Sequence, residues 1–290
     1  MHEARGGLLI LQTTLLTAVA MLAFAANSLL CRLALQQGEI DPVSFAGIRL
    51  VSGAIVLAVI LRFRTERPAA SHADWLAAAM LFAYVAFFSF AYLTLSAGTG
   101  ALILFGAVQL TMFSVGLRSG EKFGSVAWLG LALAVAGLVY LVSPGIAAPP
   151  LAGAALMAIA GVAWGVYSLR GRAVADPLAA TAGNFARAAP LALLLSLLFI
   201  ANSRAYANEA GVALAIASGA LTSGIGYVIW YAALSKLTAM RAATVQLSVP
   251  LIAAFGGVAF LSEAITPRLA AACATILGGI AMVLASKSRT

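Results

Sequence analysis

Four amide side chains stand inside long apolar segments of this chain, namely Asn27, Gln109, Asn184 and Gln246. A polar side chain in apolar surroundings is costly, so each of these residues is informative. An amide offers hydrogen-bond donors and an acceptor, and it can therefore bind an ammonium or a carboxylate group. The alternative is that these amides only join neighbouring helices through hydrogen bonds. The sequence leaves both interpretations open.

Two arginines, Arg49 and Arg187, also lie several residues inside apolar segments. A guanidinium matches a carboxylate through paired hydrogen bonds, so either residue is a candidate carboxylate-binding group. Each could instead bond carbonyls at a helix end, or extend its charged tip to a membrane interface. Because an arginine follows the Asp-Pro pair in both halves of an internal repeat, the structural role is favoured.

Aromatic side chains form a third group. Tyr84 and Phe88 stand four residues apart on one face of a helix, and Trp164 and Tyr227 lie well inside two later segments. Rings that carry a few polar atoms suit the wall of a cavity for a small apolar ligand. The alternative is a belt of aromatic residues at a membrane interface, which suits residues near segment ends better than these deeper ones.

The elements that position these side chains are predicted to be membrane helices. The 290 residues are 63% hydrophobic and only 9% charged, whereas a soluble domain has about 25% charged residues. One crossing takes about 20 apolar residues, and backbone in lipid must satisfy its own hydrogen bonds. The segments lack the alternating polarity of barrel strands. We therefore predict an all-α integral membrane protein with ten transmembrane helices. Their predicted ranges are 8–35, 43–61, 75–95, 99–117, 124–142, 151–169, 178–201, 210–234, 242–261 and 268–286.

Basic residues predict the orientation, because cytoplasmic loops accumulate Lys and Arg. With the N-terminus inside, the inner segments carry twelve of the 17 basic residues. These are Arg5, Arg62, Arg64, Arg67, Arg118, Lys122, Arg170, Arg172, Lys236, Arg241, Lys287 and Arg289. We predict a multi-pass protein of the cell inner membrane with both termini in the cytoplasm. The same bias accounts for the net charge of +8 without nucleic acid as a partner.

The first segment permits a second interpretation. Arg5, the apolar run after it and Ala23-Phe24-Ala25 resemble a signal peptide with a small-residue cleavage site. Against this, the run is long for a signal, and the segment has a partner later in the chain.

An internal repeat divides the chain. The segment 95–121 aligns without gaps on 237–263, and Asp41-Pro42 with Arg49 recurs as Asp176-Pro177 with Arg187. Five helices in each half force the second half to enter the membrane upside down, which is the plan of many secondary transporters. We predict a first repeat over 1–145 and a second, inverted repeat over 146–290.

Two prolines lie inside predicted helices of the second repeat, Pro190 and Pro250. Each removes a helical hydrogen bond, and such interruptions are where transporters often place sites or hinges. Both are therefore candidate hinges. Val108 stands where the first repeat would carry the counterpart of Pro250, so the fourth helix lacks the proline that would predict a kink there.

Several short motifs recur in a fixed order along the chain. They are the paired Asp-Pro entries with Arg49 and Arg187, Trp164-Gly165, Tyr231-Ala232-Ala233-Leu234, Val249-Pro250-Leu251 through Leu261-Ser262-Glu263, and Gly278-Gly279. Their set resembles the drug/metabolite transporter superfamily in its ten-helix EamA type, and within it the YddG-like amino-acid exporters. Phe24-Ala25 departs from the Trp-Gly usual in the first helix. The resemblance implies export of amino acids or other metabolites by alternating access.

We expect seven side chains from both repeats to form the substrate site near the midplane. They are Asn27, Tyr84, Phe88, Gln109, Trp164, Tyr227 and Gln246. All nine acidic residues fall in predicted loops or at helix ends. A site without carboxylates suits neutral or zwitterionic metabolites, with aromatic or other apolar amino acids first, and offers no proton relay. Other metabolites or drugs handled by the same superfamily are the alternative substrates.

Other functional classes fit the sequence less well. Both histidines, His2 and His72, fall in predicted loops, and no nucleophile motif or paired-aspartate cluster accompanies them. An enzyme, a metal site and a cofactor are therefore not expected, and Cys31 and Cys273 are expected to be packed thiols. A membrane receptor or scaffold gives no reason for a cavity between inverted halves. The expected partners are a small-molecule substrate and the lipid bilayer, with a monomer slightly favoured.

Overall fold

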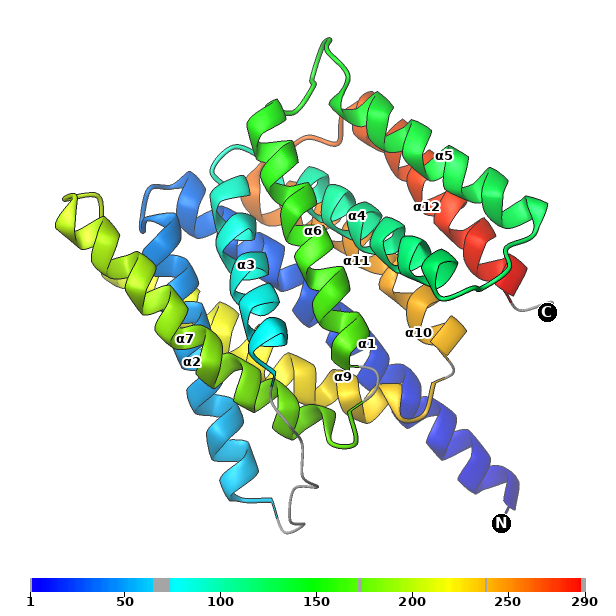
Figure 1. Cartoon of the computed structure of the whole chain (residues 1–290), viewed down its shortest axis with the longest axis horizontal. Helices are drawn as coiled ribbons and strands as arrows, with labels where there is room; N and C mark the ends of the chain where they lie inside the picture. Colours follow the sequence, from blue (N-terminus) through cyan, green and yellow to red (C-terminus); the bar gives the residue numbers. More distant parts are fainter. Residues whose placement is uncertain (1, 65–73, 172–173, 238, 288–290) are drawn as a thin grey trace.

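Figure 1 shows a computed structural model of the chain as a bundle of helices. The structure describes residues 2–64, 74–171, 174–237 and 239–287, and every named element in these ranges is helical. The elements are α1 (His2–Gln36), α2 (Pro42–Arg62), α3 (Trp75–Ala91), α4 (Ala97–Arg118), α5 (Ser125–Val142), α6 (Leu151–Gly171), α7 (Pro177–Ala201), α8 (Glu209–Ile216), η1 (Ala217–Ile225), α9 (Gly226–Leu234), α10 (Ala239–Gln246), α11 (Ser248–Leu261) and α12 (Pro267–Lys287). Arg67, His72, Arg172 and Arg289, which entered the sequence predictions, lie outside the described residues.

The predicted all-helical membrane class is confirmed. Within the described ranges, nine helical stretches are long and apolar enough to cross a membrane. The elements α8, η1 and α9 together make one of these stretches, and α10 with α11 makes another. The remaining predicted helix is α3, which is apolar but has 17 residues. The count of ten crossings therefore stays a prediction.

Each Asp-Pro pair begins a helix. The carboxylate of Asp41 accepts hydrogen bonds from the backbone N–H groups of Val43 and Ser44, both at 2.9 Å. Asp176 accepts one from the N–H of Ala179 at 3.1 Å. The proline that follows each aspartate occupies the start of the helix, where its missing N–H costs nothing. The repeated motif is thus an N-cap, which explains why it recurs in both halves.

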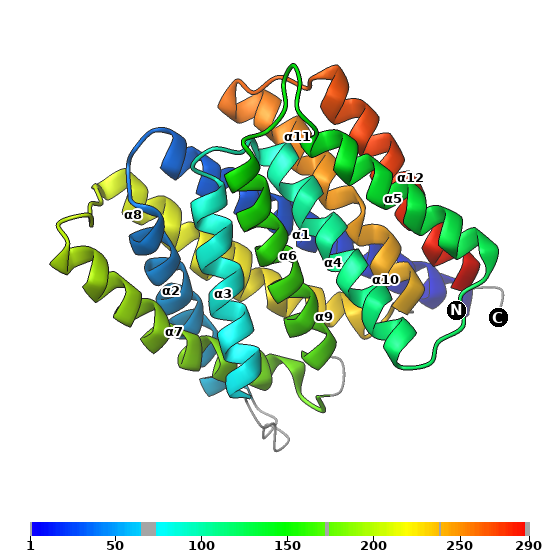
Figure 2. The same ribbon diagram turned by 45° about the horizontal axis from the view of Figure 1, so that its top comes forward.

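Helix packing repeats between the halves. Helices α3 and α4 of the first half both pack on α6 of the second half. Their counterparts α9 and α11 of the second half both pack on α1 of the first half. The pairs α2–α7, α4–α11 and α5–α12 each join a helix to its own repeat counterpart. Figures 1 and 2 both show α5 and α12 side by side along one flank of the bundle. This exchange of equivalent contacts is the pattern of two halves related by a pseudo-twofold axis.

Two expected helices of the second half are interrupted. The predicted eighth helix, 210–234, contains the π-helical segment η1. The predicted ninth helix is broken between α10 and α11, because Pro250 has no N–H to donate to the carbonyl of Gln246. By contrast, α4 runs unbroken past Val108, and α7 continues through Pro190. The hinge roles of Pro190 and Pro250 stay predictions.

Candidate functional site

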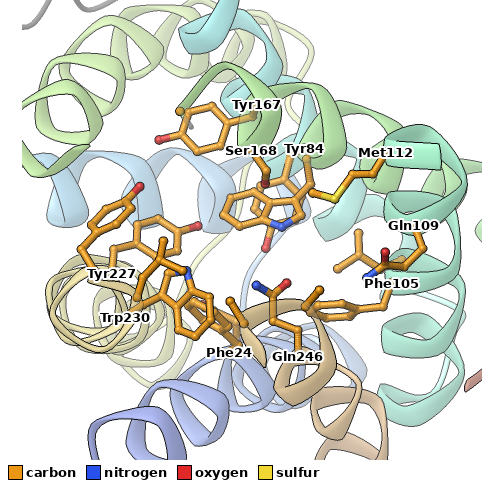
Figure 3. Close-up of a pocket in the computed structure, with 18 of the residues that line it drawn as sticks. Phe24, Tyr84, Phe105, Gln109, Met112, Tyr167, Ser168, Tyr227, Trp230 and Gln246 are labelled. Atoms are coloured by element: carbon orange, nitrogen blue, oxygen red, sulfur yellow. The ribbon is translucent and has the colours of Figure 1, made fainter. Parts of the chain in front are cut away.

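One cavity of about 480 Å³ lies between the two halves. All seven side chains predicted for the site line it, although they come from six different stretches of the chain: Asn27, Tyr84, Phe88, Gln109, Trp164, Tyr227 and Gln246. Figure 3 shows the rings of Tyr227 and Trp230 on one side of this space and Phe105 with Gln109 on the other. Every lining residue within the described ranges is uncharged.

Aromatic rings make up much of the wall. The Trp164 indole stacks on the Tyr227 ring with 5.6 Å between centroids, and it lies 4.8 Å from the Tyr84 ring. Phe24 meets both Tyr227 and Trp230 edge-on at 5.8 Å. Such a surface offers a large apolar contact at little cost in side-chain entropy.

Close helix packing places Trp164 in this wall. A Cβ atom added to Gly161 would lie 2.6 Å from the carbonyl oxygen of Leu104, and one added to Gly165 would lie 2.9 Å from Thr111. The two glycines therefore let α6 approach α4 more closely than larger residues would allow.

The π-helical segment η1 holds Asn27 in place. The side-chain amide oxygen of Asn27, Oδ1, accepts hydrogen bonds from the hydroxyls of Thr222 at 2.7 Å, Ser218 at 2.8 Å and Ser223 at 3.4 Å. These bonds occupy the acceptor end of the amide. The donor end, Nδ2, has no hydrogen-bond partner among the described residues and belongs to a side chain that lines the cavity.

Arg49 is buried directly behind the wall, with 1% of its surface exposed. Its Nη2 donates to the Tyr84 hydroxyl at 3.1 Å and its Nε to the Ser223 hydroxyl at 3.2 Å. Its guanidinium carbon lies 5.1 Å and 5.3 Å from the ring centroids of Phe88 and Tyr84. The third nitrogen, Nη1, is buried without a hydrogen-bond partner. No carboxylate of the described residues pairs with this cation.

Arg187 lies in α7, the repeat counterpart of α2, but its environment differs from that of Arg49. It is partly exposed, donates to the Gly183 carbonyl of its own helix at 3.3 Å, and lies 5.7 Å from the ring centroid of Trp75. It does not line the cavity. The two arginines therefore differ in their surroundings, and they also differ in spacing, because Arg49 lies eight residues after Asp41 and Arg187 eleven residues after Asp176.

The bundle has two ends, visible at lower right and upper left of Figure 1. We call the end with the start of α1 and the end of α12 the termini face, and the other end the opposite face. The cavity extends toward the termini face, where its lining includes Gly171, Pro177, Leu234 and Leu237 at the ends of helices and in the following turns.

A polar cluster joins four helix ends at the opposite face, and we call it the clamp. The Glu263 carboxylate pairs with Arg32 Nε at 3.2 Å and accepts from the backbone N–H of Ala97 at 2.8 Å. Arg32 also donates to the carbonyls of Tyr92 and Leu93 at 2.9 and 3.1 Å. Glu263 therefore lies at a helix end, as predicted, and ties α11 to the ends of α1, α3 and α4.

Ion pairs at the termini face lie to one side of the cavity lining. Arg64 pairs with Asp176 at 2.7 Å, and Arg170 pairs with Asp74, the N-cap of α3. The N–H of Leu76 and the Arg170 guanidinium hold the pKa of Asp74 below its ordinary value. These pairs join α2 to α7 and α3 to α6.

Sequence reasoning missed part of the lining. Phe24, Phe105, Met112 and Ser168 line the cavity but were not proposed as site residues. The hydroxyls of η1 were also missed, although a run of small polar residues inside an apolar segment, Ser218 to Ser223, was a usable signal. Cys31 and Cys273 are free and buried, and the described residues hold no cluster of metal-ligating side chains.

Comparisons with known proteins agree with this architecture. The sequence model of the EamA-like transporter family matches residues 11–143 and again residues 151–285. An uncharacterized protein of Pseudomonas aeruginosa is 53% identical over 95% of this chain and 96% of its own length. Uncharacterized transporters of Archaeoglobus fulgidus and Bacillus subtilis are 26% and 24% identical, covering 87% and 84% of this chain and 90% and 87% of their own lengths.

A solved crystal structure shares the fold with a TM-score of 0.65 and 21% identity, covering 95% of this chain and 98% of its own. The double match of the family model accounts for nearly the whole length and for both halves. The chain is therefore a member of the EamA-like transporter family, within the drug/metabolite transporter superfamily.

Proposed function

We propose that this protein exports small neutral or zwitterionic metabolites, first of all aromatic or other apolar amino acids, across the cell inner membrane. The observation that carries the proposal is the composition of the cavity. Its volume of about 480 Å³ is that of a small-molecule site. Its walls combine aromatic rings with the amides of Asn27, Gln109 and Gln246, and none of the described side chains in them is charged.

The same composition argues against organic cations as substrates. An exporter of cationic drugs needs an acidic group within the membrane to bind the cation and exchange it for protons. None of the described residues that line this cavity is acidic, and the buried cation Arg49 lies 5.1 Å from the ring centroid of Phe88 in its wall. Downhill movement of the substrate, without proton coupling, is therefore the mechanism that this site supports.

Alternating access would use the two repeats, 1–145 and 146–290, as the moving halves, with both termini in the cytoplasm. The cavity reaches the termini face and is separated from the opposite face by the clamp. Opening toward the opposite face requires the clamp to break, and the interruption at Pro250 offers a place for α10 and α11 to bend. We propose a monomer as the transporting unit, because the two repeats that line the cavity belong to one chain.

The proposal is tested by uptake into proteoliposomes from a panel of labelled amino acids, sugars and cationic dyes. We expect saturable uptake of phenylalanine or leucine without an imposed pH gradient. Trp164→Ala removes the ring that stacks on Tyr227, so uptake should fall at least tenfold.

The matched control is Trp75→Ala, because Trp75 is a tryptophan at the exposed start of α3 outside the cavity. This variant should transport within about twofold of the parent. If no amino acid is taken up, or if a dye is taken up only with a pH gradient, the proposed substrate class is wrong.

A further inference from the structure

The inner end of the cavity is made of hydrogen-bond donors. Tyr84 and Asn27 line this end, and Arg49 lies behind them. Each has a donor group for which the described residues supply no acceptor: the Tyr84 hydroxyl proton, Asn27 Nδ2 and Arg49 Nη1. A site built from donors alone is complementary to a group that only accepts.

The charge of Arg49 makes this imbalance severe. A guanidinium stays protonated in proteins, and burying an unpaired charge in a low-dielectric interior is strongly unfavourable. The rings of Phe88 and Tyr84 offset part of this cost through cation–π contacts, but neither carries a negative charge. An anion placed in the cavity beside Tyr84 would complete the pairing.

Tyr84 connects the cation to the cavity. Its oxygen accepts a hydrogen bond from Arg49 Nη2, so its own proton is left to donate elsewhere, and the adjacent cation strengthens that donor. Asn27 is oriented in a related way, because three hydroxyls of η1 occupy its carbonyl oxygen. Both polar contacts are therefore set before a ligand arrives.

We propose that this end of the cavity binds the carboxylate of the substrate, with Tyr84 and Asn27 as the contacting donors and Arg49 as the positioning cation behind Tyr84. A carboxylate accepts several hydrogen bonds and carries the negative charge that would balance the Arg49 cation. The aromatic wall of Trp164, Tyr227 and Trp230 then holds the apolar body. The inference rests on the proposed function for the identity of the cavity as the transport site.

Arg187 supplies the internal control for this assignment. Like Arg49, it lies in a helix that an Asp-Pro pair begins, but it bonds its own helix and lies beside Trp75 outside the cavity. The carboxylate role that the sequence offered to either arginine is therefore assigned to Arg49 alone.

The test measures the shift in melting temperature of the purified full-length protein with three ligands of similar size. They are phenylalanine, 3-phenylpropionate, which lacks the ammonium group, and phenethylamine, which lacks the carboxylate. We expect the first two to stabilise the protein and phenethylamine to give no shift. Sodium chloride at equal concentration is the control, because a site that accepts any anion would also be stabilised by chloride.

Variants locate the effect. Tyr84→Phe removes only the hydroxyl and keeps the packed ring, so its affinity for 3-phenylpropionate should fall about tenfold or more. Arg49→Gln should do the same, whereas Arg187→Gln should bind like the parent. Tyr84→Phe keeps the test valid if Arg49→Gln fails to fold.

Equal stabilisation by phenethylamine and 3-phenylpropionate, equal stabilisation by chloride, or unchanged affinity in Tyr84→Phe would each overturn the inference. The proposed function fails differently. If no amino acid is transported while carboxylates still stabilise the protein through Tyr84, the carboxylate site stands and the assigned transport does not.

Discussion

The two ends of the bundle contrast sharply. At the opposite face, Glu263 binds Arg32 and the N–H of Ala97, and side chains of this ion pair are only 15% and 11% exposed for Arg32 and Glu263. At the termini face, the cavity lining consists of uncharged residues such as Gly171 and Leu237. The clamp ties the ends of α1, α3, α4 and α11 together, whereas the ion pairs of the termini face join α2 to α7 and α3 to α6.

The internal repeat relates the two ends of the bundle to each other. Glu121 is the repeat counterpart of Glu263, and inversion of the second half sends the two glutamates to different faces. Each glutamate N–H bonds back to its preceding helix, that of Glu121 to the Gly116 carbonyl five residues earlier at 3.0 Å and that of Glu263 to the Gly257 carbonyl six residues earlier at 3.1 Å. A repeated glutamate thus lies at each end of the bundle. In the clamp, this glutamate binds Arg32 and the N–H of Ala97.

The largest effect on this contrast is expected from Glu263→Gln. The substitution keeps the shape of the side chain but removes its charge, so the closed opposite face loses charge-assisted hydrogen bonds to Arg32 and Ala97. Hydrogen bonds to charged groups contribute about 1.5–3 kcal/mol, so the population open to the opposite face should rise about ten- to a hundredfold. The measurement uses Ser28→Cys, at a residue of the cavity lining, in a background without Cys31 and Cys273. The rate at which a thiol reagent labels this cysteine from the opposite face is compared with and without Glu263→Gln.

The control is Glu39→Gln, which removes an acidic charge from the same face outside the clamp, where Glu39 bonds Asn208. It should leave the labelling rate unchanged. If Glu263→Gln labels no faster than Glu39→Gln, the clamp does not hold the opposite face shut.

A smaller effect is expected from Asp74→Asn at the termini face. Because the folded-state pKa of Asp74 is lowered, its charge stabilises the fold above the unfolded pKa, and this contribution is lost as the pH falls through the folded value. Asn can still cap α3, so at neutral pH the variant should lose less than about 1 kcal/mol. Thermal unfolding from pH 7 to pH 3 should show the difference from the parent shrinking below about pH 4. A difference that grows with acidity would contradict the assignment.

The scaffold was predictable because lipid imposes simple rules on the sequence. Apolar length and the repeated Asp-Pro caps located the helices, and a polar residue deep in an apolar helix had to face other protein. This is why Asn27, Gln109 and Gln246 were found without a structure and all line the cavity.

What escaped prediction depends on rotation and local backbone form. Phe24, Phe105 and Met112 lie three or four residues from Asn27 or Gln109, so helical spacing from these two amides could have located them. Segment η1 could not be foreseen as π-helical, because its bonds to Asn27 join positions about 190 residues apart. The two arginines looked equivalent because burial, which separates them, is a property of packing.

The most direct test of the central claim uses Ser168, a small residue of the cavity lining visible in Figure 3. In the background without native cysteines, Ser168→Cys is exposed to an impermeant thiol reagent from each side of sealed vesicles, with and without saturating phenylalanine. We predict reaction from the termini face and at least tenfold slower reaction when phenylalanine is present. Reaction from the opposite face alone, or an equal rate with and without phenylalanine in a protein that transports it, would contradict the account of a substrate cavity open to the termini face.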